Sequence, residues 1–301
     1  MVEATKVVTE IKERFKIIGR DQEIKQIIVA HSVGKNILLE GNVGVGKTTL
    51  AKAVSQYFGF SDANSNHSKF YRVDCSEELL PHNLVGYFDP PLVIANGYNE
   101  DSYKYGPLAE AMLNGGCLFI NEINRMPENT QNSLLTALDE GILEIPKLKT
   151  IKAHKDFFVI ATQNPAAHVG VTVLGEALKD RFIWINLDYQ LSEEEVLIIK
   201  QEAQLDKTTT LSAEKVASIS QEIIHATRNS TSIRRGSSIR GGIDLATIVN
   251  QYESNSSSKN WIEAAVMALY NKIELEDGLT QSKKEIITDI VLAVLNRSDF
   301  Q

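Results

Sequence analysis

The chain has 301 residues, of which 43% are apolar and 23% are charged, and its formal net charge is −8. This composition is ordinary for a folded protein and excludes wholesale disorder. The acidic balance disfavours a protein that coats nucleic acid, because phosphate contacts require a basic surface. The length favours about two domains of roughly 150 residues each.

The sequence also disfavours a membrane protein and a disulfide-bonded protein. No apolar run approaches the ~20 residues needed to span a bilayer, and residues 1–14 lack the apolar core of a signal peptide. Cys75 and Cys117 lie in apolar stretches, which is typical of buried free thiols in a reducing compartment. We therefore expect a cytoplasmic protein without membrane insertion.

Short apolar runs alternate with helical patterns over residues 1–189. Strands are expected at 35–41, 70–73, 116–120, 157–162 and 182–187, and helices at 5–16, 21–32, 48–58, 108–113 and 128–140. Asp21 is the candidate N-cap of the second helix. Because the strands are apolar on both faces, they predict an α/β layer in which helices cover a parallel sheet.

Two further stretches lie between these elements. Residues 142–145 and 150–152 flank a short turn and predict a β-hairpin. Residues 89–104 precede Tyr105-Gly106-Pro107 and have no clear periodicity. Simple surface loops remain the alternative for both stretches.

The pattern changes after Leu187, where apolar residues recur at three and four and β-rich runs disappear. This change predicts a second domain, all-helical, over residues 190–301. Ser192 with Glu195 and Ser282 with Glu285 match the capping box. Helices are expected at 193–203, 214–227, 242–252, 259–273 and 283–295.

Residues 41–48 fit the phosphate-binding pattern G-x-x-x-x-G-K-[ST] between a predicted strand and a predicted helix. Glycines let backbone N–H groups turn toward phosphates, and the helix start adds a partial positive charge. Lys47 is expected to contact the β- and γ-phosphates, and Thr48 to bind Mg²⁺. A glycine-rich surface turn is the alternative. The expected nucleotide-binding residues of this loop are Gly41, Asn42, Val43, Gly44, Val45, Gly46, Lys47, Thr48 and Thr49.

The predicted strand 116–120 is followed by Asn121 and Glu122. Side chains at the carboxyl end of such a strand face the ligand crevice. Glu122 can polarise an attacking water. Asn121 stands where an acid usually holds Mg²⁺ through its water shell, and an amide is a weaker partner for this cation. We therefore expect weakened Mg²⁺ binding and slower turnover. The alternative is that Asn121 and Glu122 are unrelated polar residues at the end of a strand.

Five segments in order resemble the MoxR family of AAA+ ATPases. Two of them are Asn121-Glu122-Ile123-Asn124-Arg125-Met126-Pro127 and the run 158–165, which ends in Thr162-Gln163-Asn164-Pro165. The others are 130–135, 174–182 and 236–240, and together the resemblance covers roughly residues 17–245. It implies a P-loop AAA+ core that binds ATP with Mg²⁺, followed by a helical lid.

The resemblance also implies roles for single residues of the core. Asn164 is the expected sensor that orients the attacking water, and the alternative is that it merely ends a strand before a proline. Arg181 is the expected arginine finger, which reaches a neighbouring subunit's nucleotide and stabilises transition-state charge. A buried salt bridge with Asp180 or another neighbour is the alternative for Arg181.

Two expectations concern the ends of the resembling region. Ile18 and Gly19 are similar to the segment on the adenine side of the nucleotide. Arg240 is the expected second sensor, carried by the helical domain onto the phosphates. Arg234 and Arg235 compete for this role, because Ser232-Ile233-Arg234 has the same pattern as Ser238-Ile239-Arg240.

The resemblance implies an ATP hydrolase that acts as a ring, expected to be a hexamer, and remodels a client protein in a chaperone-like way. The client class that it implies is a protein with a von Willebrand factor A domain. Residues 89–104 correspond to the insertion that marks the clade and projects toward a central pore. A nucleotide-binding scaffold with little hydrolysis is the second hypothesis, because of Asn121. A nucleic-acid motor is the third, and the acidic charge disfavours it.

Overall fold

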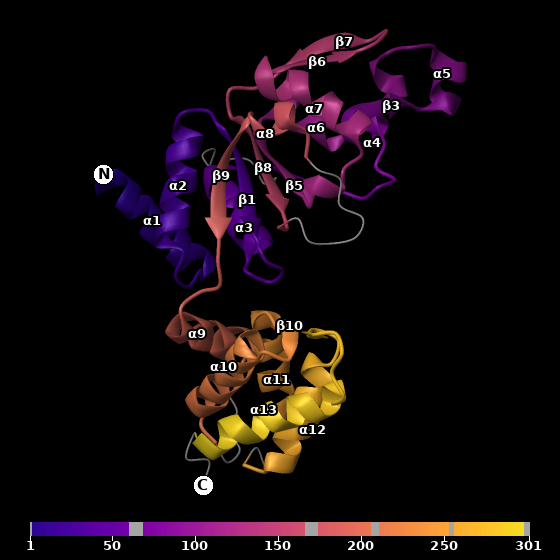
Figure 1. Ribbon diagram of the computed structural model, residues 1–301. Helices are drawn as coiled ribbons and strands as arrows, with labels where there is room; N and C mark the ends of the chain where they lie inside the picture. The colour runs from indigo at the N-terminus through magenta and orange to yellow at the C-terminus, as the bar shows by residue number, and fades with distance from the viewer. Residues whose placement is uncertain (1, 60–68, 166–173, 206–210, 253–255, 298–301) are drawn as a thin grey trace. The chain divides into compact units, whose positions relative to one another are not determined.

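The computed structural model describes residues 2–59, 69–165, 174–205, 211–252 and 256–297 (Figure 1). Contacts between residues divide the chain into two compact units. The first comprises residues 1–42 and 46–188, and the second comprises residues 43–45 and 189–301. None of the helices in the described ranges combines the length and the apolar character required to cross a membrane.

The first unit is built on a five-stranded parallel sheet in the order β2-β5-β8-β1-β9. The interior strand β5 is fully buried from Cys117 to Ile120, as expected for a strand covered on both faces. The predicted parallel α/β fold is therefore confirmed. The strands are β1 (Asn36–Gly41), β2 (Phe70–Asp74), β5 (Gly116–Asn121), β8 (Phe157–Gln163) and β9 (Phe182–Leu187).

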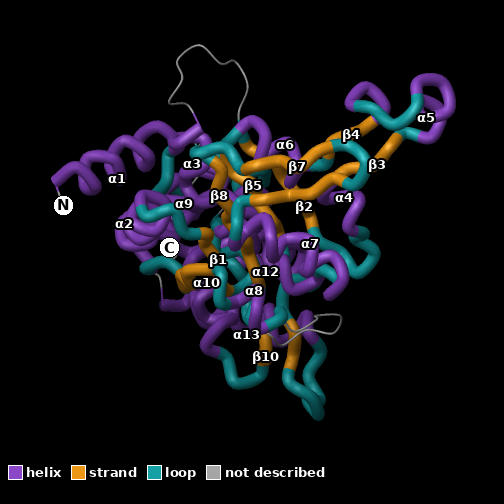
Figure 2. The backbone as a smooth tube through the Cα atoms, turned by 90° about the horizontal axis from the view of Figure 1, so that it is seen from above, coloured by secondary structure: helices purple, strands orange, loops and turns teal. Residues whose placement is uncertain are grey.

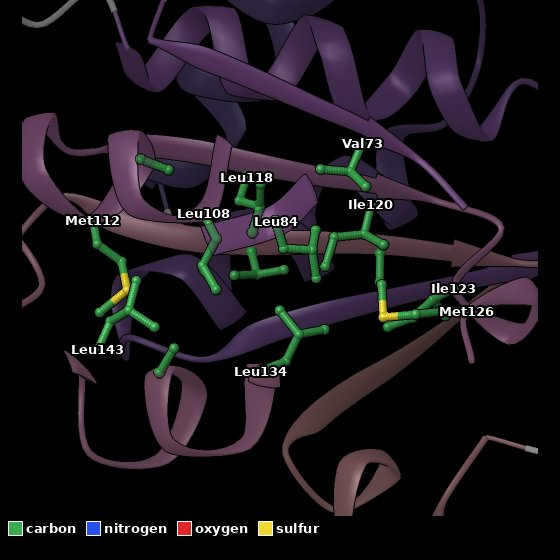
Figure 3. Packing of buried hydrophobic residues seen from close by; sticks show 14 of the residues in the cluster. Val73, Leu84, Leu108, Met112, Leu118, Ile120, Ile123, Met126, Leu134 and Leu143 are labelled. Atoms are coloured by element: carbon green, nitrogen blue, oxygen red, sulfur yellow. The ribbon is translucent and has the colours of Figure 1, made fainter. Parts of the chain in front are cut away.

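Helices and the sheet share a continuous apolar core in this unit. Figure 3 shows Leu118 and Ile120 of β5 beside Leu108 of α6 and Leu134 of α7, and all four side chains are fully buried. This packing fixes the carboxyl ends of the strands relative to the short helix η2 (Ile123–Arg125). The helices of the unit are α1 (Val2–Phe15), α2 (Asp21–Ser32), α3 (Lys47–Gly59), α4 (Pro81–Val85), α6 (Pro107–Asn114), α7 (Glu128–Asp139) and α8 (Glu176–Lys179).

The predicted N-cap of α2 is wrong. The helix begins at Asp21, and the cap position belongs to Arg20, whose φ of 63° lies in the left-handed region. The Asp21 carboxylate instead accepts a hydrogen bond from Lys12 of α1. Because Asp21 already has helical geometry, its side chain pairs across two helices and does not cap its own helix.

An arm built from residues 86–105 extends from the sheet. Its strands β3 (Gly86–Phe88) and β4 (Tyr103–Tyr105) are antiparallel, and α5 (Pro90–Asn96) and η1 (Glu100–Ser102) lie between them. In Figure 2, β3 and β4 lead away from the sheet toward α5. The predicted hairpin is confirmed as β6 (Ile142–Ile145) and β7 (Lys149–Lys152). The hairpin contacts the arm, since Lys149 lies over the Tyr105 ring and Lys147 over the Tyr98 ring.

The second unit is a helical bundle (Figure 1). Its apolar core includes Trp261, which is fully buried. A two-stranded sheet of β10 (Ile233–Arg235) and β11 (Glu274–Leu275) accompanies the helices. The predicted helical region is confirmed, but it is not all-helical, because it contains this small sheet. The helices are α9 (Ser192–Glu202), α10 (Ala213–Asn229), α11 (Ile239–Val249), α12 (Ser258–Leu269) and α13 (Lys283–Arg297).

Local details of this bundle differ from the prediction at several helix ends; helix α12, for example, ends at Leu269 and not at residue 273. Helix α11 begins at Ile239, three residues before the expected range. Gly242 lies inside this helix at a close contact, since a Cβ there would lie 2.8 Å from Ile199 Cδ1. The capping box at Ser282 is confirmed, since the backbone N–H of Ser282 donates a hydrogen bond to the Glu285 carboxylate. The capping box at Ser192 is wrong, because the N-cap is Leu191 and Glu195 is buried against another helix.

Candidate nucleotide-binding site

The glycine loop connects the carboxyl end of β1 to the first residue of α3. Gly44 and Gly46 have φ of 84° and 90°, values that L side chains rarely adopt. A Cβ at Gly46 would meet no described atom within 4 Å, so space is open beside the loop at this residue. Thr48 is half-buried and Thr49 exposed in the first turn of α3. This geometry suits an anion that is bound by backbone amides and a helix N-terminus.

The Lys47 ammonium lies against the loop and the end of β8. The residue is only 9% exposed. Its Nζ donates to the carbonyl oxygens of Gly41 at 2.6 Å and Asn42 at 2.9 Å, and to Asn164 Oδ1 at 2.8 Å. The contact with Asn164 joins two predicted site residues that are 117 positions apart in the sequence.

Glu122 follows β5 with φ 56° and ψ 53°, a left-handed conformation that is rare for a residue with a side chain. Such backbone strain costs of order 1–3 kcal/mol and is concentrated at functional sites. The Glu122 carboxylate accepts a hydrogen bond from Asn164 Nδ2 at 3.3 Å and pairs with Arg125 Nε at 3.0 Å. Its backbone N–H donates to Thr162 Oγ1 at 3.0 Å. Asn164 therefore lies between the Glu122 carboxylate and the Lys47 ammonium.

Asn121 is held on both sides at the end of β5. Its Nδ2 donates to Asp74 Oδ1 at 2.9 Å, and its Oδ1 accepts from Thr162 Oγ1 at 3.1 Å. Sequence reasoning missed both partners. The same rule that singled out Asn121, a polar residue at the end of a buried strand, could have found Asp74, which directly follows the predicted strand 70–73.

The charge at Asp74 is shaped by its neighbours. Arg72 donates to the carboxylate through Nη2 at 2.6 Å and Nε at 2.8 Å. These hydrogen bonds are the largest cause of a lowered pKa at Asp74, burial opposes them, and the hydrogen bond from Asn121 lowers the pKa further. A hydrogen-bonded chain thus runs from Asp74 through Asn121, Thr162, Glu122 and Asn164 to Lys47.

Arg181 lies outside this chain. Its guanidinium donates to the Ala177 carbonyl and pairs with Asp139 Oδ2 at 2.9 Å, so its described acidic partner is not Asp180. Its buried Nε has no hydrogen-bond partner among the described residues. The arginine is half-buried at the start of β9 and is braced against the end of α7.

The predicted adenine-side segment lies between α1 and α2. Ile18 is half-buried, and Gly19 is buried with φ of 65°. The next residue, Arg20, donates to Glu23 at 2.6 Å and to the backbone oxygen of Asp188 at 2.7 Å. Arg20 thereby fixes this segment against the chain that leaves β9.

In the second unit, the three candidate sensor arginines differ in their partners. Arg235 pairs with Glu274 at 2.6 Å, and Arg234 pairs with Glu274 and Asp277 at 3.6 Å each. Arg240 is exposed at the second position of α11 and has no ion pair within the described ranges.

Comparisons with known proteins agree with this architecture. A family model for the AAA domain of the dynein-related subfamily matches residues 36–182. A protein of Staphylococcus aureus is 30% identical over 251 residues, which cover 81% of this chain and 91% of that protein. Protein YojN of Bacillus subtilis is 35% identical over 202 residues, which cover 63% of this chain and 61% of YojN. Both relatives are described as uncharacterized.

Two solved structures have a similar fold. One is a proposed ATPase from Cytophaga hutchinsonii, with a TM-score of 0.51 and 22% identity, covering 97% of this chain and 95% of that one. The other is a mutant of RuvB from Thermotoga maritima, with a TM-score of 0.50 and 18% identity, covering 93% and 69%. At these identities the likeness concerns the fold alone. From the family match and the relative in Staphylococcus aureus, the chain belongs to the AAA domain family, in its dynein-related subfamily.

Proposed function

We propose that this protein is an AAA+ ATPase of the MoxR type, which binds ATP with Mg²⁺ and uses hydrolysis to remodel a client protein. The observation that carries the proposal is the placement of Asn164 between Lys47 and Glu122. A cation, a polar side chain and a carboxylate meet beside a glycine loop, which is the combination that phosphoryl transfer to water requires.

The residues around the loop fit a nucleotide with its metal. Mg²⁺, when bound, neutralises charge on the β- and γ-phosphates. Lys47 exchanges its contacts with backbone carbonyls for phosphate oxygens, and the amides near Gly46 bind the phosphates. Thr48 and Asn121 serve the metal side of the site. Glu122 polarises the attacking water, and Asn164 holds the Glu122 carboxylate and orients that water.

The second candidate is a nucleotide-dependent scaffold, and Asn121 favours it. The amide carries no charge, and both of its ends already have protein partners. A weaker metal site would allow ATP binding and assembly with little hydrolysis. A nucleic-acid motor is a third hypothesis, disfavoured by the net charge of −8, and stimulation of ATPase activity by DNA or RNA would favour it.

Assembly and client are further parts of the proposal. We propose a ring, with a hexamer as the expected size, in which Arg181 of one subunit completes the nucleotide site of its neighbour. The half-buried Arg181 would exchange Asp139 for phosphate charge. The client class, a protein with a von Willebrand factor A domain, rests on the resemblance to the MoxR family.

The test is phosphate release from ATP and Mg²⁺, measured against protein concentration. Turnover per subunit is expected to rise with concentration, because assembly completes the site. Glu122→Gln should abolish turnover and leave ATP binding intact, because removing a positioned general base costs about 10²–10⁴-fold. Glu128→Gln, an exposed carboxylate at the start of α7, is the matched control.

One outcome would contradict the ATPase proposal, and another would contradict the role of Glu122. If neither the wild type nor Glu122→Gln releases phosphate although both bind ATP, the result will favour the scaffold. Turnover that is equal in the wild type and Glu122→Gln would show that another group activates the water.

A further inference from the structure

Asp74 and Asn121 form a polar pair across two strand ends. The parallel register of β2 and β5 places the two residues opposite each other, and Asn121 Nδ2 donates to Asp74 Oδ1 at 2.9 Å. On its other side, Asn121 accepts a hydrogen bond from Thr162, whose hydroxyl also receives the backbone N–H of Glu122. Three hydrogen bonds therefore connect Asp74 to Glu122 of the proposed hydrolytic site.

The pair carries a single negative charge, and that charge is on β2. An acid at both positions would place two carboxylates within hydrogen-bond distance, where their mutual repulsion disfavours ionisation of both. Asp74 is the ionised partner, because Arg72 and Asn121 both donate to it. The position on β5 that usually bears the charge is neutral, and the adjacent position on β2 is anionic.

We propose that Asp74 is the carboxylate of the Mg²⁺ site, holding a water of the metal's shell together with the Asn121 oxygen. This inference rests on the proposed ATP-binding function. Within the described residues, no group of three or more His, Cys, Asp or Glu side chains could hold a metal by itself. A Mg²⁺ site needs no such group, because Mg²⁺ keeps several waters and is bound through one or two carboxylates plus phosphates.

Arg72 would compete with the metal site for the Asp74 carboxylate. It pairs with Asp74, and the two side chains are 46% and 57% exposed. Exposed ion pairs are weak because water screens them, so a hard cation nearby can draw the carboxylate away. If Asp74 serves the metal, removing Arg72 strengthens metal binding. If Asp74 only braces the sheet edge, removing Arg72 leaves metal binding unchanged or weaker.

The experiment measures Mn²⁺ binding by electron paramagnetic resonance, with protein saturated by a non-hydrolysable ATP analogue. Asp74→Asn is expected to weaken Mn²⁺ affinity by about tenfold or more, as for other groups behind metal ligands. Affinity for the analogue in EDTA should not change. Glu78→Gln removes the same charge from an exposed side chain four residues later and should match the wild type.

Two further variants keep a carboxylate in the pair, and they decide the matter even where Asp74→Asn does not fold. Exchange of the two side chains, Asp74→Asn with Asn121→Asp, should restore Mn²⁺ affinity to within about threefold of the wild type, because it moves the charge to the usual strand. Arg72→Gln should raise Mn²⁺ affinity severalfold.

Unchanged Mn²⁺ affinity in Asp74→Asn, or lowered affinity in Arg72→Gln, would overturn the inference. Failure of the folded exchange variant to restore affinity would overturn it too. If the proposed ATP-binding function is wrong, the result will differ from these. The wild type will then bind the analogue as weakly as Lys47→Ala does, both in EDTA and in the presence of Mn²⁺.

Discussion

The candidate functional residues of the sheet unit and Arg240 of the helical unit differ in whether their charged groups have polar partners. In the sheet unit, Lys47, Glu122 and Arg181 each have a described polar partner within the unit. In the helical unit, Arg240 is exposed and has no described ion pair, while nearby Arg234 has acidic partners.

This difference in partners affects how much free energy ligand binding costs. Groups that are held by their neighbours lose little conformational entropy on binding, but they must exchange one partner for another. A free arginine on a helix has nothing to exchange, and it must be ordered by the ligand itself. We therefore expect large effects from the partnered residues and a small effect from Arg240.

Arg181→Ala is the strongest test of the partnered class. An arginine finger contributes about 10³–10⁵-fold to turnover, so we expect phosphate release at saturating ATP to fall by about a thousandfold. ATP affinity should stay close to that of the wild type. Asp139→Ala removes the described partner of Arg181 and should preserve turnover, because the guanidinium then has less to give up.

Mixing tests whether this arginine acts on a neighbouring subunit. Arg181→Ala and Lys47→Ala should each be inactive alone. A mixture should regain activity, because some intact loops then face an intact arginine. No recovery in assembled mixed rings, or a joint loss of folding and ATP binding in Arg181→Ala, would indicate a structural brace.

Lys47→Ala should have the next largest effect. Hydrogen bonds to charged groups contribute about 1.5–3 kcal/mol each, so ATP affinity in a calorimetric titration should fall about ten- to a hundredfold. Lys52→Ala is the matched control, since Lys52 is an exposed lysine on the same helix. Equal affinities of the two variants would contradict the phosphate-binding assignment of the loop.

The sheet could be predicted because its strands need no information from elsewhere in the chain. Residues 117–120 are apolar on both faces, and they form a fully buried interior strand of the sheet. An insertion at residues 89–104 was predicted, but the strands of the arm were missed, because β3 and β4 are three residues each and pair across 14 intervening residues. Local periodicity carries no signal over such a range.

The sequence predicted which types of residue occupy the candidate site, but it did not predict which of them form hydrogen bonds with each other. The strand-end rule singled out Asn121 and Glu122, but the register that places Asp74 beside Asn121 depends on how β2 and β5 align. Similarly, the acid of the Ser192 capping box serves Arg228, 33 residues away, at 2.9 Å. The partner of such a side chain is set by the tertiary packing, and sequence spacing cannot rank distant partners.

Arg240→Ala should have the smallest effect. Exposed ion pairs contribute about 0.2–1 kcal/mol, so ATP affinity should weaken by up to about fivefold. Arg234→Ala is the control, because its guanidinium is already shared between Glu274 and Asp277 and should leave ATP affinity unchanged. A larger loss in Arg234→Ala than in Arg240→Ala would reverse the comparison, because a partnered arginine would then be the one that meets the nucleotide. Equal and negligible losses would exclude both arginines as the second sensor and leave Arg235, which pairs with Glu274 at 2.6 Å, as the remaining candidate of the three.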